Sequence, residues 1–134
     1  MSEDKAGVAG VLHAYAKAYD TLDPEALIPF YHEPCLLIAP PGVFVLATHA
    51  DITRLFAPFM LNLKARGYRG SAYREVQAKV LNESTAMISG VCTRSGAGGE
   101  PLERFGQTCT LRLNKDRWCI AVNAIHEPET ALKF

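Results

Sequence analysis

The sequence lacks an excess of charge of either sign, because 14 basic side chains are matched by 14 acidic ones among its 134 residues. Affinity for nucleic acid depends mainly on neutralising phosphates, so this balance argues against a nucleic-acid partner. It also lacks an apolar run long enough to span a bilayer, since the longest, residues 35–47, is interrupted by Pro40-Pro41-Gly42. We therefore expect neither nucleic acid nor a membrane as a partner.

Metal and redox motifs are absent as well. The four cysteines, at 35, 92, 109 and 119, form no CxxC pair, and each lies in an apolar, strand-like segment. The four histidines show no HxH or HExxH spacing. This pattern predicts buried thiols, no metal site and no cofactor. The chain starts with a polar stretch and shows no hydrophobic targeting segment there, so we expect a cytoplasmic location.

What the sequence does contain is helical periodicity in its first half. Apolar residues recur at helical spacing over residues 8–22, with Ser2 as a plausible N-cap, and again over residues 52–63. Between them, Asp23-Pro24-Glu25 is typical of a helix start and predicts a short helix to about Phe30. Thr48 and Asp51 have the spacing of a capping box, and Pro58 is expected to kink the helix that follows. The first half therefore predicts three helices.

Strand-like segments account for the rest. Two short ones, 35–39 and 43–47, flank the Pro-Pro-Gly turn, and four more follow at residues 72–81, 84–94, 102–113 and 117–126. The intervening residues have turn compositions compatible with antiparallel hairpins. This order predicts an α+β fold in which the helices cover one face of a curved antiparallel sheet. We expect residues 1–134 to form a single domain.

The stretch AYAKAYDTLDPEAL at residues 14–27, leading to FYHEP at 30–34, resembles the NTF2-like (SnoaL-like) superfamily. The segments APPG at 39–42, THADI at 48–52 and WCI at 118–120 extend the resemblance over nearly the whole chain. It implies a cone of three helices on a strongly curved, mostly antiparallel sheet of about six strands, with a pocket between them. The superfamily includes isomerases, dehydratases, cyclases, epoxide hydrolases and non-catalytic domains, so the resemblance implies no particular reaction.

The steroid isomerases of this superfamily use a tyrosine and a protonated acid to hold an oxyanion, and an aspartate as base. The resemblance places Tyr15 at the tyrosine position, Ala39 at the base position, and the second acid near Cys109. An alanine methyl accepts no proton, and a thiol is a poor oxyanion donor. We therefore expect a member of the superfamily without isomerase activity of that kind.

Candidate pocket residues come from both helices and strands. Tyr15 and Tyr19 lie one turn apart on the buried stripe, where ordinary core packing is the alternative interpretation. Strict alternation places Asn123 on one face with Cys119, Ala121 and Ile125, either toward the pocket or on an outer face. The complete set of pocket candidates is Tyr15, Tyr19, Ala39, Phe56, Phe59, Met60, Gln107, Cys109 and Asn123.

Two further polar residues, Arg94 and His126, could belong to a site or simply lie at strand ends. Both faces of residues 84–94 are apolar, so Arg94 is either an anion-binding group or, as we expect, an exposed strand end. His126 with Glu127 is either an acid–base pair near the pocket mouth or, as we expect, part of a solvated strand end. Apart from Arg94, no lysine or arginine lies on the inferred inner faces, so the pocket predicts a small, mostly apolar ligand with a carbonyl or hydroxyl and no phosphate. The alternatives are a cofactor-independent lyase, isomerase or hydrolase that uses the same pocket, and a sheet-mediated interaction domain. We also expect a homodimer formed through the convex face of the sheet.

Overall fold

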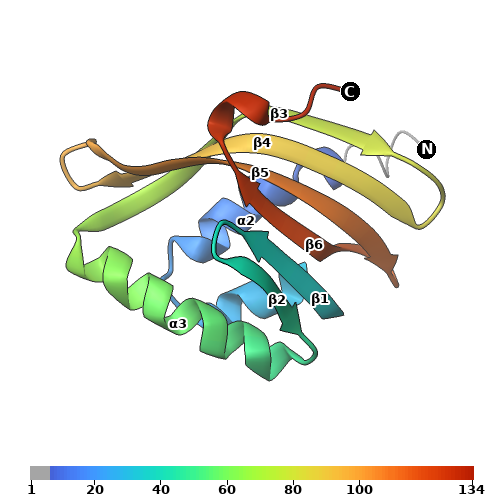
Figure 1. Ribbon diagram of the computed structural model, residues 1–134, viewed down its shortest axis with the longest axis horizontal. Coiled ribbons are helices and arrows are strands. Elements are labelled where there is room, and N and C mark those ends of the chain that lie inside the picture. Colours follow the sequence, from blue (N-terminus) through green and yellow to red (C-terminus); the bar gives the residue numbers. More distant parts are fainter. Residues whose placement is uncertain (1–6) are drawn as a thin grey trace.

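A computed structural model describes residues 7–134, in which two α-helices and a 3-10 helix lie against one face of a six-stranded sheet (Figure 1). These are α2 (Val11–Tyr19), η1 (Pro24–Phe30) and α3 (His49–Ala65). The three helices predicted from the sequence are thus confirmed. Ser2, the predicted N-cap, lies outside the described residues. None of the helices over residues 7–134 is long and apolar enough to cross a membrane.

The helix starts follow from local sequence. Asp23 caps η1, because its Oδ1 accepts the backbone N–H of Glu25 at 3.0 Å and Pro24 occupies the first helical position. The capping box predicted for α3 is present, and Asp51 Oδ2 accepts the N–H of Thr48 at 3.1 Å. The helix continues through Pro58. Short-range capping therefore sets where each helix begins.

The six strands form one sheet in the order β2-β1-β6-β5-β4-β3. The pairing of β1 with β6 is parallel, and every other pairing is antiparallel. This confirms the predicted mostly antiparallel sheet of about six strands. The strands are β1 (Tyr31–Ala39), β2 (Gly42–Leu46), β3 (Tyr68–Val80), β4 (Thr85–Gly96), β5 (Pro101–Asn114) and β6 (Arg117–His126).

Two strands begin four residues earlier than the sequence predicts. β1 starts at Tyr31 rather than Cys35, because Tyr31 pairs with Ile120 of β6. β3 starts at Tyr68 rather than Ala72, directly after Gly67, whose φ of +80° suits glycine in the turn that ends α3. The early start of β1 carries the ring of Tyr31 into the core, where it is 2% exposed.

Strict alternation fails in β6. Ile120 opposes Leu111 and Val122 opposes Thr110, so the register shifts across Ala121. This bulge brings Ile120 into the core cluster and Asn123, three residues later, to the same side. The prediction that Asn123 shares a face with Cys119 and Ala121 is therefore wrong, whereas its placement with Ile125 holds because both line the cavity described below.

The sheet face opposite the helices is partly covered by the chain's own end (Figure 1). The short helix η2 (Pro128–Thr130) follows β6, and the backbone N–H of Leu132 then donates to Ser89 Oγ at 2.8 Å. Further on, the N–H of Phe134 donates to Gln77 Oε1 at 3.0 Å. On the same face, the half-buried His126 has its Nε2 at 2.7 Å from Thr108 Oγ1 and its Nδ1 at 3.0 Å from Thr130 Oγ1. The C-terminal segment 127–134 thus lies on the outer surface of the sheet.

Candidate functional site

A cavity of about 310 Å³ lies between α2, α3 and the inner face of the sheet. Its wall is mostly aromatic and aliphatic, and five of its residues carry amide or charged side chains. Apolar concavities with a few polar groups are the usual form of small-molecule sites. The lining residues are Tyr15, Tyr19, Leu37, Ala39, Pro41, Phe44, Phe56, Phe59, Asn62, Leu63, Arg94, Glu103, Phe105, Gln107, Asn123 and Ile125.

Seven of the nine candidate residues line this cavity, namely Tyr15, Tyr19, Ala39, Phe56, Phe59, Gln107 and Asn123. Met60 does not: it lies beside Leu22 and Pro24, on the side of α3 that faces the start of η1. Cys109 is fully buried between the amides of Gln107 and Asn123 and is not part of the lining. Met60 does not line the cavity because the apolar stripe of α3 is wider than the cavity. Cys109 does not line it because β5 extends beyond the cavity wall.

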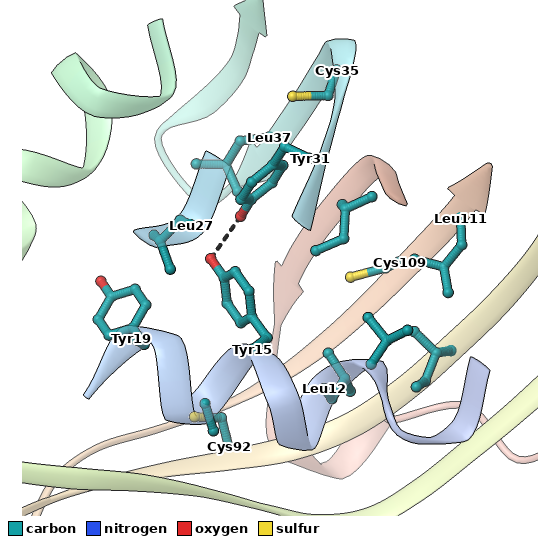
Figure 2. Packing of buried hydrophobic residues seen from close by; sticks show 14 of the residues in the cluster. Leu12, Tyr15, Tyr19, Leu27, Tyr31, Cys35, Leu37, Cys92, Cys109 and Leu111 are labelled. Atoms are coloured by element: carbon teal, nitrogen blue, oxygen red, sulfur yellow. Dashed lines mark hydrogen bonds between the residues drawn. The ribbon is translucent and has the colours of Figure 1, made fainter. Parts of the chain in front are cut away.

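Tyr15 meets a second tyrosine that the sequence analysis did not identify. Its hydroxyl lies 2.7 Å from that of Tyr31, both side chains being buried (Figure 2). Asn123 Nδ2 donates to the same Tyr31 oxygen at 3.0 Å. The periodicity of the first helix revealed Tyr15, but Tyr31 lies in a stretch with neither a clear helical nor a clear strand pattern. In the sequence, the one signal for burial of Tyr31 is its aromatic side chain next to that of Phe30.

The hydrogen bonds continue beneath the cavity floor. The Cys109 thiol donates to Asn123 Oδ1 at 3.6 Å, and Gln107 Nε2 donates to Cys109 Sγ at 3.6 Å. The hydroxyl of Tyr73, from β3, donates to Gln107 Oε1 at 2.6 Å. A buried chain therefore runs from Tyr73 across β5 and β6 to the tyrosine pair, and it fixes the orientation of both amides.

The hydrogen-bonded chain has more N–H and O–H donors than it uses internally, and the unused donors are available to a ligand in the cavity. With Asn123 donating to Tyr31, the two tyrosine hydroxyls hold two hydrogens but share only one bond, so one hydrogen remains for a further acceptor. Tyr15 lines the cavity and Tyr31 does not. The Gln107 and Asn123 amides each keep a second N–H as well. The polar part of the floor therefore offers donors to an acceptor atom.

These donors are neutral and stay protonated. Burial raises the pKa of Tyr15 well above its ordinary value, as does the neighbouring Tyr31 hydroxyl. Burial likewise raises the pKa of Tyr31 and Tyr73 and brings that of the Cys109 thiol to about 12. At neutral pH the network therefore carries no charge, and Cys109 is an uncharged thiol.

Arg94 lies in a different environment from the one that its sequence predicts. It was expected at an exposed strand end, yet it is 7% exposed and lines the cavity. β4 extends to Gly96, and alternation along it places Arg94 on the same side as Ile88 and Cys92, which belong to the core. The guanidinium carbon lies 3.8 Å from the centre of the Tyr19 ring. The prediction of an exposed strand end for Arg94 is thus wrong, and Arg94 is the one cation among the lining residues.

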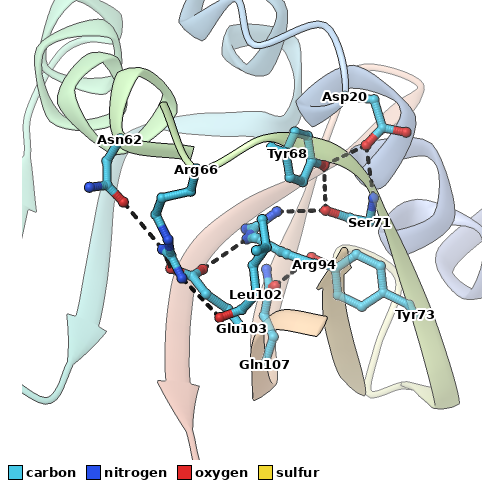
Figure 3. Close-up of polar contacts among 10 residues, drawn as sticks. All are labelled: Asp20, Asn62, Arg66, Tyr68, Ser71, Tyr73, Arg94, Leu102, Glu103 and Gln107. Atoms are coloured by element: carbon cyan, nitrogen blue, oxygen red, sulfur yellow. Dashed lines mark hydrogen bonds and ion pairs between the residues drawn. The ribbon is translucent and has the colours of Figure 1, made fainter. Parts of the chain in front are cut away.

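A carboxylate accompanies this arginine. Glu103, on β5, has its Oε1 at 3.5 Å from Arg94 Nε, while its Oε2 accepts from Arg66 Nη1 at 2.9 Å (Figure 3). Glu103 lies directly opposite Arg94 in the strand register. The alternation that identified Gln107 could have found Glu103, because residues 103, 105 and 107 share one face of β5.

The arrangement differs from that of a steroid isomerase. Ala39 lines the cavity where the resemblance places the base, and it offers only a methyl group. Glu103 is the one carboxylate among the lining residues, and both of its oxygens are engaged by arginines. No cluster of three metal-ligating side chains is present in residues 7–134.

Comparison with family models gives a match to the NTF2-like protein (DUF6841) family over residues 4–128. The match covers most of the sequence. The chain belongs to this family. No curated protein matches the sequence. Membership of the NTF2-like family agrees with the resemblance found in the sequence and with the cone-like arrangement of helices and sheet.

Solved structures share the fold of this family member at low sequence identity. An NTF2-like protein with a cystatin-like fold from Novosphingobium aromaticivorans has a TM-score of 0.81 and 17% identity, over 98% of this chain and 90% of that one. A cystatin-like protein of unknown function from Nostoc punctiforme gives 0.78 and 16%, over 94% and 92%. A ketosteroid isomerase-like protein from Erwinia carotovora atroseptica gives 0.70 and 17%, over the full length of both. These similarities establish the fold alone.

Proposed function

We propose that this NTF2-like protein binds a small, mostly apolar ligand in the cavity between its helices and its sheet. The observation that carries the proposal is an aromatic and aliphatic wall combined with an ordered set of donors on the floor. The wall would remove apolar surface of a ligand from water. The donors of Tyr15, Asn123 and Gln107 would bind an acceptor oxygen such as a carbonyl.

Preorganisation supports this assignment. Asn123 and Gln107 are nearly fully buried, and their bonds to Tyr31, Cys109 and Tyr73 hold them in place. A donor that is already fixed loses little conformational freedom on binding, so more of each hydrogen bond contributes to affinity. A floor of this kind favours ligands that place an acceptor at one defined point.

Ligand binding without catalysis fits this cavity better than the alternatives. A cofactor-independent lyase, isomerase or hydrolase needs a group to accept a proton, and Glu103 is already paired with Arg66 and Arg94. A sheet-mediated interaction domain needs a free outer face, part of which residues 127–134 occupy.

The test is a thermal-shift screen of apolar compounds that carry a carbonyl or hydroxyl, followed by calorimetric titration of the best compound. Tyr15→Phe should weaken its binding by about 0.5–1.5 kcal/mol, the usual net value of a neutral hydrogen bond. Tyr68→Phe is the matched control, because its hydroxyl bonds to Asp20 and Ser71 and Tyr68 does not line the cavity. The proposal fails if only phosphorylated or polyanionic compounds bind, or if the two variants behave alike.

A further inference from the structure

Arg94 is the most deeply buried charged residue among residues 7–134, at 7% exposed. A buried charge is costly unless hydrogen bonds and an opposite charge compensate it. The guanidinium group carries five N–H donors, and the number that bond to protein atoms shows how completely its burial is compensated.

Protein atoms use only part of this donor set. Arg94 Nη1 donates to Ser71 Oγ at 2.8 Å, and Nε lies 3.5 Å from Glu103 Oε1. Over the described chain, Nη2 has no hydrogen-bond partner, although every fully buried side-chain nitrogen or oxygen there has one. Nη2 must therefore reach accessible space, and Arg94 lines the cavity. One N–H of Nη1 and two of Nη2 remain for a ligand.

Aromatic rings hold the guanidinium in a fixed place. Its central carbon lies 3.8 Å from the centre of the Tyr19 ring and 5.1 Å from that of Phe105. Stacking of this kind is favourable for arginine and restricts how its planar group can turn. The free donors are thus presented in a defined direction, next to the apolar surface that would contact the body of a ligand.

The nearby charges do not cancel. Glu103 is shared between Arg94 and Arg66, so these three side chains together carry one positive charge (Figure 3). The next carboxylate, Asp20, contacts Tyr68 and the backbone of Ser71, and it reaches Arg94 only through Ser71. One net positive charge with free N–H donors suits a planar group with one negative charge.

We propose that the ligand of this cavity carries a carboxylate, bound by the free guanidinium donors of Arg94, on an aromatic or alicyclic body. This inference rests on the proposed function and narrows it to small apolar monocarboxylic acids. An arginine with a purely structural role is expected to direct its donors to protein acceptors, and Arg94 makes one hydrogen bond and one long ion pair.

The experiment compares three ligands of one shape by calorimetric titration at neutral pH: 2-naphthoic acid, 2-naphthamide and methyl 2-naphthoate. Wild-type protein should bind the acid roughly ten- to hundredfold more tightly than either neutral compound, as expected for a charge-assisted bond. Arg94→Met should abolish this preference, so that the acid binds no more tightly than the amide or the ester. Arg94→Lys should retain part of it, because lysine keeps the charge but not the planar fork.

Arg104→Met is the matched control. It removes one cation from the same strand as Glu103, but Arg104 is half-exposed, pairs with Glu129 and does not line the cavity. This variant should keep the preference of the wild type for the acid.

The outcomes separate the two proposals. If the amide or ester binds as tightly as the acid, the carboxylate inference is wrong while the apolar cavity site stands. If neither these compounds nor those of the broader screen bind, the proposed function falls as well. A preference for the acid that survives in Arg94→Met places the anion elsewhere and overturns the inference. If Arg94→Met does not fold by circular dichroism, the wild-type comparison and Arg94→Lys still decide.

Discussion

Alkaline pH is expected to unfold this protein through its buried tyrosines. All five tyrosines have a raised pKa, chiefly because burial disfavours the phenolate. In the unfolded chain the phenolic pKa is about 10. Above that pH the unfolded state releases protons that the folded state keeps, so the free energy of unfolding falls as pH rises. Below about pH 10 this contribution to stability is fully present.

The magnitude follows from Tyr15, Tyr31 and Tyr73, the three tyrosines whose pKa burial raises furthest above the ordinary value. Each group that is protonated only in the folded state changes the free energy of unfolding by about 1.4 kcal/mol per pH unit, so three give about 4 kcal/mol per unit. A domain stable by about 5–15 kcal/mol should then unfold between about pH 11 and pH 14. The buried thiols of Cys92 and Cys109, whose pKa burial also raises, should start the decline about a unit earlier.

The assay is urea unfolding followed by the fluorescence of Trp118, the single tryptophan, at pH values from about 8 to about 11. Near-ultraviolet absorbance of tyrosinate, recorded in parallel, should rise together with the loss of circular dichroism. Tyr73→Phe should reduce the slope above pH 10 by about 1.4 kcal/mol per unit. Tyrosinate absorbance that develops fully near pH 10 in a protein with unchanged circular dichroism would refute the buried network.

Three further predictions concern packing, catalysis and assembly. Gly90→Ala should destabilise the fold by about 1–3 kcal/mol in urea unfolding, because the new Cβ would lie 3.1 Å from Val76 Cγ2 and 3.2 Å from Leu12 Cδ1. Gly98→Ala, which meets only the flexible end of Glu100, should stay within about 0.5 kcal/mol, and equal costs would contradict this reasoning. With Ala39 at the base position, a β,γ-unsaturated ketone should isomerise no faster than in buffer, and clear turnover would count against the assignment. Light scattering should give twice the chain mass of 14.7 kDa, whereas a monomer at tens of micromolar would end the expectation of a homodimer.

The helices could be predicted because their signals are local. Asp23 and Pro24 start η1, and Thr48 and Asp51 start α3, through contacts within a few residues of the chain. The aromatic stripe that carries Tyr15 needs only helical periodicity to be recognised. Features set by short-range geometry were therefore predicted correctly.

The inner face of β4 could not be predicted, and the reason lies in the C-terminal segment. Both faces of this strand are apolar, because Val91 on the outer side is as buried as Ile88 on the inner side. Residues 127–134 cover part of that outer side, as the bond from Leu132 to Ser89 shows. A strand covered on both faces has no polar alternation to reveal its orientation, so the burial of Arg94 was missed.

The placement of Asn123 depended on a long-range feature of another kind. The shift in register across Ala121 arises from pairing with β5 and leaves no mark in the sequence of β6 itself. Tyr31 was missed for a similar reason, since its strand begins only through parallel pairing with Ile120. Tyr31 and Asn123, which are hydrogen-bonded to each other, are thus both positioned by contacts between distant segments.

The parallel pairing of β1 with β6 has a consequence for synthesis of the chain on the ribosome. β1 and β2 have no place in the sheet until β6, which ends at His126, has been made. Until then β5 is an unpaired edge that could associate with other strands, and nascent chains depend on rapid completion to avoid aggregation. The bond between Tyr31 and Asn123 joins residues 92 positions apart, so the cavity is expected to be the last part of the molecule to form.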